Sequence, residues 1–497
     1  MAVTELAFPG KVCYGEDTKK KQERSYRFAG KGANVSTEPP KGSAMGVWPM
    51  GAGALSVGHS FSFVRNSTKK GDGSMALTII KGTIVSAPAP GQLDITEPGY
   101  LVAEDGVIRG VYGTLPAEYT GAAVEDFGDC LVLQTFADLH LHAPQYPMVG
   151  TGMDLTLLDW LNTYTFPAEA RFSDPDYARK VYRQLSAELI ANGTTRVAMF
   201  SSLHTDATLI LMEELERAGV TGYAGKVNMD RNAAPGVLEE TTEESIRETE
   251  RWLAECGRFS HVRPMLTPRF TPSCTDELMA WLGKTAEEEH LPIQSHLSEN
   301  DREIEWVRQL HPDCRQYWET YAKFGLWNDR TLMAHCVWSD ERERAAMKDA
   351  GVTVVHCPDS NVNVCSGTAP VRAMLEEGMK VALGSDIAGG DHLNMFDVTA
   401  SAIRASKVRQ MTDPAHPAFL TVPEAWYLAT SAGAAFFGEA PGFAPGNPLH
   451  AMVLSDDALP QSHPLTARER FERCIYRRQQ GALRAVWSAG RKVYEAE

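Results

Sequence analysis

Residues 194–227, TTRVAMFSSLHTDATLILMEELERAGVTGYAGKV, contain the unit that decides the fold. Thr194–Phe200 and Thr221–Val227 are short, apolar-rich runs of the kind that form buried strands. Between them, Ala207–Ala218 has the apolar spacing of a helix packed on one face. The stretch therefore predicts a strand, a helix and a second strand in succession.

The same alternation continues on both sides of this unit. Further helices are expected over 176–192, 242–256, 275–289, 301–310, 339–349 and 370–377, and further strands over 131–138, 262–267, 292–296, 331–335, 352–356 and 380–385. Eight strands alternating with helices over about 255 residues are the pattern and length of a (β/α)8 TIM barrel. Two more helices, 395–409 and 422–437, are expected after the eighth strand.

The regions outside the barrel have a different pattern. Short apolar runs separated by Gly and Pro turns precede it, and β patterning returns after Phe443. We therefore predict an α/β protein in which a small flanking β domain is built from residues 75–130 and 441–497. The catalytic barrel with its extra C-terminal helices then spans 131–440. Residues 1–74 have no sustained period and a net charge of about +5, which predicts a disordered extension or a native start near Met75.

The composition excludes several classes of function. The chain has 497 residues, with 48 Lys and Arg against 64 Asp and Glu, for a formal net charge of −16. Binding to nucleic acid or to an anionic membrane needs clustered positive charge, so neither is expected. Nine Cys without a CxxC pair favour reduced thiols in a cytoplasmic protein. An enzyme that acts on a small molecule fits this composition.

Four histidines and one aspartate fall where predicted barrel strands end, which is where barrel enzymes carry their active sites. His140 and His142 are two residues apart, so an extended strand directs both imidazoles to the same side. Several imidazoles with one carboxylate suit Zn²⁺ or Fe²⁺, and an incomplete protein shell leaves room for water. The five residues are His140, His142, His296, His335 and Asp386.

Any one of these histidines could instead be a hydrogen-bonded core residue, but five polar residues at strand ends favour a metal site. We expect structural roles for His204 and His356, because a metal already has enough ligands without them. The HExxH, P-loop and G-x-S-x-G patterns are missing from the sequence, which removes the signatures of the common metalloproteases, NTPases and serine hydrolases.

Glu299 follows His296 by three residues, in Ser295-His-Leu-Ser-Glu-Asn300. A helix beginning after the strand would place its carboxylate on the rim beside the metal. There it can take a proton from metal-activated water and pass it to the substrate. The alternative is an ordinary first-turn Glu at a helix N-terminus. Its position next to a predicted ligand favours the catalytic role.

These residues resemble the amidohydrolase superfamily in its mononuclear-metal deaminase branch. The binuclear branch has a carboxylated Lys at the end of strand four, where this chain reads Arg263-Pro-Met-Leu-Thr-Pro-Arg269. Longer motifs resemble the guanine deaminases within the superfamily: HAPQY (142–146), LDWL (158–161), YTFPAE (164–169), PRF (268–270), SHLSEN (295–300), AHC (334–336), HCPDSN (356–361) and LGSDIAGG (383–390). The resemblance covers residues 77–493. One departure is Leu133-Gln-Thr-Phe-Ala-Asp138, where the family usually has a Pro-Gly turn.

The resemblance implies roles for particular residues. His140, His142, His296 and Asp386 would bind one Zn²⁺, with Fe²⁺ as the other candidate metal, and His335 would hydrogen-bond the attacking water or the substrate. Glu299 would protonate a ring nitrogen and help ammonia leave, and Asp386 would share the proton transfer. The implied substrate-binding residues are Gln145 and Arg269 at the oxygen-bearing edge of the base, Phe270 and Trp160 on its faces, and His142. Core packing is an equal alternative for Trp160.

The implied function is zinc-dependent hydrolysis of guanine to xanthine and ammonia in a cytoplasmic homodimer. An alternative is a deaminase or hydrolase of another amino-azine, such as 8-oxoguanine, a pterin or a triazine. A non-catalytic scaffold on the same barrel is a third hypothesis. It would be marked by lost metal ligands, and here every ligand is present.

Overall fold

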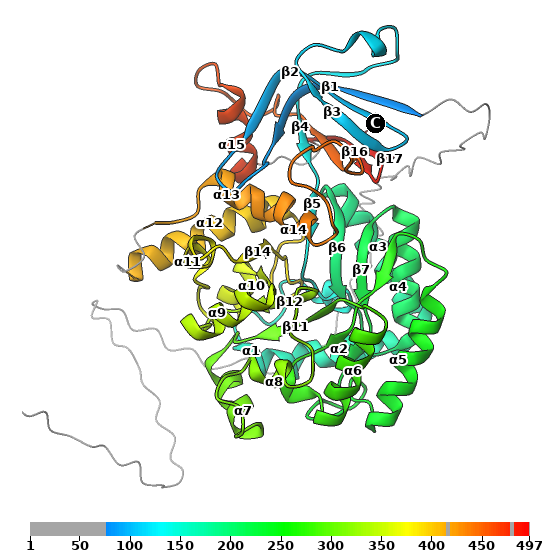
Figure 1. The fold of residues 1–497 in the computed structure, drawn as a ribbon, viewed down its shortest axis with the longest axis vertical. Helices are drawn as coiled ribbons and strands as arrows, with labels where there is room; N and C mark the ends of the chain where they lie inside the picture. The colour runs from blue at the N-terminus through cyan, green and yellow to red at the C-terminus, as the bar shows by residue number, and fades with distance from the viewer. Residues whose placement is uncertain (1–75, 414–417, 478–481, 497) are drawn as a thin grey trace, which may run out of the picture. The chain divides into compact units, whose positions relative to one another are not determined.

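The computed structural model describes residues 76–413, 418–477 and 482–496 (Figure 1). The predicted extension 1–74 lies outside these residues. Among the described helices, none is both long and apolar enough to cross a membrane.

Two parallel sheets of four strands each form the centre of the fold. Their orders are β5-β6-β7-β9 and β11-β12-β13-β14, and a short pair, β8 with β10, lies beside them. The bounds are β5 (Phe136–Asp138), β6 (Thr194–Phe200), β7 (Thr221–Gly225), β8 (Val227–Asn228), β9 (Val262–Pro264), β10 (Thr267–Pro268), β11 (Ile293–Leu297), β12 (Thr331–His335), β13 (Thr353–His356) and β14 (Lys380–Leu383). Seven of the eight predicted strands are therefore found within a residue or two, although the third and fourth are each divided in two, and the first begins five residues later than predicted.

Backbone contacts connect the two parallel sheets at both of their edges. Leu266 forms a parallel bridge with Ile293 on one side. On the other side the Leu139 N–H donates to the Leu383 carbonyl at 3.2 Å, and the Asp386 N–H donates to the His140 carbonyl at 2.7 Å. The arrangement is of the TIM-barrel type, and its interior is filled by small and medium apolar side chains such as Ala137, Ala198, Leu332, Val355 and Ala382.

The helices follow the predicted strand–helix alternation and cover the sheets (Figure 1). The Asp174 carboxylate caps the first long helix by accepting from the backbone N–H groups of Asp176 and Tyr177. Gly219, in the left-handed conformation, ends the next one. The long helices are α3 (Pro175–Ala191), α4 (Thr205–Ala218), α5 (Thr242–Cys256), α6 (Asp276–Glu288), α7 (Asp301–Leu310), α9 (Glu341–Ala350) and α12 (Met395–Thr412).

Shorter helical segments and the 11-residue helix α15 complete the described part of the chain. They are α1 (Leu157–Trp160), α2 (Phe166–Ala170), α8 (Glu319–Ala322), α10 (Pro358–Asn363), α11 (Val371–Glu376), α13 (Val422–Tyr427), α14 (Gly433–Ala435) and α15 (Ala467–Arg477). The helix predicted over 422–437 is therefore interrupted, because a wider π-helical turn over 428–432 separates α13 from α14.

A separate seven-stranded sheet contains strands from both ends of the described chain, in the order β17-β16-β15-β4-β1-β2-β3. Its strands are β1 (Leu77–Ser86), β2 (Asp94–Glu104), β3 (Val107–Tyr112), β4 (Glu125–Gln134), β15 (Ala451–Leu454), β16 (Leu483–Ser488) and β17 (Arg491–Glu495). The predicted first barrel strand, 131–138, was too long at its start, because 131–134 belong to β4 in this sheet.

Candidate metal and active site

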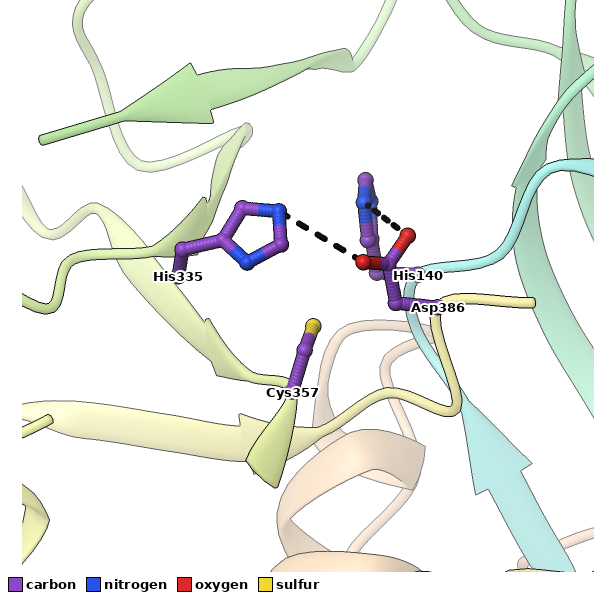
Figure 2. Close-up of side chains that lie close together, drawn as sticks. All are labelled: His140, His335, Cys357 and Asp386. Atoms are coloured by element: carbon purple, nitrogen blue, oxygen red, sulfur yellow. Dashed lines mark ion pairs between the residues drawn. The ribbon is translucent and has the colours of Figure 1, made fainter. Parts of the chain in front are cut away.

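The predicted metal-site residues lie together at the carboxyl ends of the parallel strands. His140 and His142 follow β5, His296 lies within β11, His335 ends β12, and Asp386 follows β14. His335 and Asp386 have positive φ angles of 72° and 47°, so both strands turn sharply where these side chains enter the site. Figure 2 shows the imidazoles of His140 and His335 directed at the Asp386 carboxylate.

Hydrogen bonds fix which ring nitrogen of the histidines faces the site. His140 Nδ1 lies 2.7 Å from Gln294 Oε1, and His296 Nδ1 lies 2.6 Å from the Arg269 carbonyl oxygen. Both partners are acceptors, so each Nδ1 carries the hydrogen and each Nε2 keeps a lone pair. His140 Nε2 is buried without a hydrogen-bond donor beside it. This is the arrangement expected of imidazoles that ligate a metal.

The distances between the candidate ligand atoms fit one tetrahedral ion. His142 Nε2 lies 3.2 Å from His296 Nε2, and Asp386 Oδ1 lies 3.2 Å and 3.4 Å from Nε2 of His140 and His142. Four ligands bound to Zn²⁺ at their usual lengths are about 3.3 Å apart. Two imidazole lone pairs at such a distance repel each other unless a proton or a cation lies between them. This donor set indicates a metal cofactor.

Burial and mutual repulsion favour the neutral form of the His142 and His296 imidazoles. Desolvation, and then the neighbouring histidines, hold the pKa values of His142 and His296 well below the usual range. Burial alone would raise the pKa of Asp386, but the imidazoles of His140, His335 and His142 lower it well below its usual range. Neutral imidazoles and an ionised carboxylate are the protonation states in which these side chains bind metal.

Asp138 connects the end of β5 to the segment that carries Asp386. It is fully buried and accepts from the Ser385 N–H at 2.9 Å and from the Ser385 hydroxyl at 2.5 Å. The contact joins the end of the first strand to the residue that precedes Asp386. The departure from the family pattern before Asp138 thus leaves this link intact.

Cys357 was missed by the sequence reasoning. With His140, His335 and Asp386 it forms a buried group whose ligand atoms all lie within 4.8 Å of one another (Figure 2). Burial, with the nearby carboxylates, raises the pKa of its thiol well above the usual range. The residue therefore remains a thiol, and its Sγ donates toward the Val355 carbonyl. A metal ligand would have to be the thiolate.

Glu299 lies in the loop between β11 and α7, two residues before the helix begins, so it is not an ordinary first-turn residue, which was the alternative to the catalytic role. Its Oε2 is 3.5 Å from His335 Nε2, and its Oε1 accepts from the Ser366 hydroxyl at 3.3 Å. His335 Nδ1 in turn donates to Asn361 Oδ1 at 2.8 Å. Burial raises the pKa of the Glu299 carboxyl to about 8, with a further contribution from Asp386. Such a group can hold and release a proton near neutral pH.

A cavity of about 480 Å³, counted with its open mouth, lies over this group. Its walls include every residue predicted to bind substrate: His142, Gln145, Trp160, Arg269 and Phe270. Glu299, His335, His296 and Asp386 also face it. His204 and His356 do not line it.

Several wall or support residues were not singled out from the sequence. Glu169 contacts both Gln145 and Arg269, and Glu303 lines the cavity. Ser366 contacts Glu299, and Asn361 contacts His335. Glu169 and Asn361 lie inside the quoted motifs YTFPAE and HCPDSN. Ser366 and Glu303 carried no such signal, because only the fold brings them to the cavity.

Comparisons with known proteins agree with this geometry. Residues 131–453 match the Amidohydrolase family. A guanine deaminase from Dictyostelium discoideum is 36% identical over 448 residues, which cover 84% of this chain and 98% of that protein. The Rattus norvegicus guanine deaminase is 40% identical over 326 residues, or 65% of this chain and 72% of the relative.

Among solved structures, guanine deaminase from C. acetobutylicum with guanine bound in its active site is 41% identical, with a TM-score of 0.82. The match covers 84% of this chain and 100% of that one. The chain therefore belongs to the amidohydrolase family. Within that family it belongs with the guanine deaminases, since these relatives match it over two thirds or more of their own length.

Proposed function

We propose that this protein hydrolyses guanine to xanthine and ammonia, using one Zn²⁺ held by His140, His142, His296 and Asp386. The observation that carries the proposal is the cavity itself. It is lined by the amide of Gln145 and the guanidinium of Arg269, together with Glu299 and the candidate metal ligands His142, His296 and Asp386. The guanine-bound relative, 41% identical, supports the choice of substrate.

The donor set suits zinc. Neutral imidazoles and a carboxylate at tetrahedral spacing are ligands that Zn²⁺ accepts, and Fe²⁺ is the other candidate. When bound, the ion would lower the pKa of water to around 7 and so make hydroxide available at neutral pH.

The side chains around the cavity would orient the base. The Arg269 fork and the Gln145 amide offer fixed donors to the ring carbonyl and ring nitrogen. Phe270 and Trp160 would lie against its flat faces, where aromatic rings stack well. Trp160 Nε1 donates to the Thr151 carbonyl at 2.9 Å, which fixes the indole in this wall. We propose that this orientation places the amino-bearing carbon toward His335 and Glu299.

Glu299 would move the protons. Its carboxylate accepts a proton from the attacking water and delivers it to the ring nitrogen beside the amino-bearing carbon. Water oxygen becomes the second carbonyl of xanthine, and the amino group leaves as ammonia after taking up a second proton. His335, with Nδ1 donating to Asn361, would hydrogen-bond the water or the substrate, and Asp386 would share the proton transfer. Each added proton-transfer group contributes typically 10²–10⁴-fold in rate.

The experiment is ultraviolet-monitored conversion of guanine to xanthine, with and without a chelator, alongside Glu299→Gln. We expect turnover that requires metal and falls by about 10²-fold or more in the variant. No turnover by metal-loaded protein would reject guanine as substrate. A panel of 8-oxoguanine, pterins and triazines would then separate another amino-azine hydrolase from a scaffold.

We also propose a cytoplasmic homodimer. The eight cysteines in the described part of the chain are free thiols, which suits a reducing compartment. Exposed apolar side chains of α12 and nearby segments, namely Val408, Met411, Phe419 and Tyr476, support an interface. Light scattering on purified protein would measure the assembly.

A further inference from the structure

Glu169, in the short helix α2, is a buried carboxylate that the proposed mechanism does not use. Its Oε1 accepts from Gln145 Nε2 at 2.8 Å, and its Oε2 accepts from Arg269 Nη1 at 2.7 Å. The side chains of Glu169 and Arg269 are 2% and 4% exposed. One carboxylate therefore joins the two residues proposed to bind the oxygen-bearing edge of the base.

This contact fixes the direction of the Gln145 amide. Gln145 Oε1 accepts from the Ala388 N–H at 3.1 Å, so Nε2 must face Glu169. The same helix carries Phe166, whose ring lies 5.3 Å from the guanidinium carbon of Arg269. Thus α2 holds Arg269 through both a carboxylate and an aromatic face, and leaves the remaining N–H groups of Arg269 and Gln145 for a ligand.

The pairing also cancels a charge. A guanidinium stays protonated, so without Glu169 this end of the cavity would carry an unpaired positive charge in a buried place. With Glu169 the end offers hydrogen-bond donors but no net charge. The other acidic side chains that line the cavity are Glu299, Glu303 and Asp386.

We propose that Glu169 is a specificity-determining residue, which keeps the base-binding end electrically neutral so that a neutral oxopurine binds and an anionic ring does not. The inference rests on the proposed function. The proposed product, xanthine, loses a ring proton more readily than guanine, because its second carbonyl spreads the negative charge. Neutrality at Arg269 therefore favours the neutral substrate over the ionised product.

The test is Glu169→Gln, which removes the charge and keeps the size. Binding of xanthine is measured by calorimetry in a buffer that keeps the ring neutral and in one that ionises it. We expect the ionised ring to bind the variant on the order of tenfold more tightly than wild type. Neutral xanthine should bind the variant more weakly than wild type, and the KM for guanine should rise. The reason is that the new amide cannot accept from both Gln145 Nε2 and Arg269 Nη1. If Glu169 had only a structural role, the variant would bind every ligand more weakly.

Two further variants make the result specific. Glu214→Gln removes another buried carboxylate paired with arginines, on α4 and outside the cavity wall, and should leave both affinities unchanged. The double variant Glu169→Gln with Arg269→Gln is neutral again and should lose the gain for the ionised ring. Equal weakening of both forms in Glu169→Gln would overturn the inference. Calorimetry needs no turnover, so failure of wild type to convert guanine would reject the proposed function separately.

Discussion

At the scale of single residues, the hydrogen-bond partners of the candidate ligands would decide how strongly the site holds a metal. Gln294 accepts from His140 Nδ1, and its own Nε2 donates to the Leu139 carbonyl at 2.8 Å, so its amide cannot turn around. Such a partner sets the tautomer and the direction of the imidazole. Removing a partner of this kind costs typically 10–100-fold in metal affinity.

We therefore predict that Gln294→Met weakens metal binding by about 10–100-fold while the protein stays folded. The measurement is competition for the metal against a chromogenic chelator. Asn328→Asp, at a loop far from the ligands, serves as a control and should bind metal as wild type does. Unchanged affinity in Gln294→Met would show that the backbone alone orients His140.

Ser366 contacts Glu299, the residue proposed to transfer protons. Its hydroxyl donates to Glu299, which favours the ionised carboxylate and lowers its pKa relative to burial alone. In Ser366→Ala this donor is lost, so the pKa of Glu299 rises further above 8. A base with a higher pKa is ionised only at higher pH, so the acidic limb of the activity profile should move upward. The control is Ser186→Ala, which removes a buried hydroxyl that donates to the Tyr182 carbonyl, outside the cavity wall. Identical profiles for both variants would contradict the role.

At the scale of elements, the beginning of α7 determines where Glu299 lies. Asn300 caps the helix, and Glu303 accepts from the backbone N–H groups of Glu299 and Asn300 and from the Tyr317 hydroxyl. Glu303 is 1% exposed. Burial, with a smaller contribution from Glu299, raises its pKa from 4.5 to about 7.

A raised folded-state pKa makes stability fall as pH rises. Between these two pKa values the folded protein keeps the Glu303 proton that the unfolded chain has released. The contribution of this group to stability is therefore complete below pH 4.5 and is lost as the pH rises through about 7. Glu303→Gln cannot ionise. Its free energy of unfolding should therefore fall less with rising pH than that of wild type, by on the order of 1 to 3 kcal/mol. Urea unfolding across the pH range measures it. A variant as pH-sensitive as wild type would contradict this assignment.

Elements were predictable from sequence where a change of period or a turn residue marked them. The alternation of strand and helix located every parallel strand, because buried strands are short apolar runs between helices. It could not separate β4 from β5. Residues 131–134 and 136–138 are all buried, in two different sheets, so one continuous apolar run hides the change of sheet.

The site shows the same limit. Ligands at strand ends follow from topology, since every parallel strand finishes at the same edge. Glu169, Ser366 and Cys357 come close to the residues of the site through tertiary packing, and no spacing in the sequence predicts which buried polar residues meet. The roles of the site residues thus remain proposals, to be tested by the variants described above.

At the scale of the whole molecule, a bound metal would tie the two parallel sheets together. His140 and His142 follow β5 of one sheet, whereas His296 and Asp386 belong to β11 and the end of β14 in the other. A ligand that binds only the folded state stabilises it by about 4 kcal/mol when present at about 1,000 times its dissociation constant.

We therefore predict that chelation lowers the melting temperature. For a chain of this size about 4 kcal/mol corresponds to roughly 4 °C, since the unfolding entropy grows with the number of residues. Without the cation, the imidazole nitrogens of His142 and His296 would also face each other at 3.2 Å. Calorimetry before and after dialysis against a chelator measures the shift, and metal analysis confirms removal. Asp386→Asn, which lacks the anionic ligand, should melt at the lower temperature already and respond little to the chelator. A melting temperature that stays constant after verified metal loss would mean that hydrogen bonds such as that from the Asp386 N–H to the His140 carbonyl suffice to join the sheets.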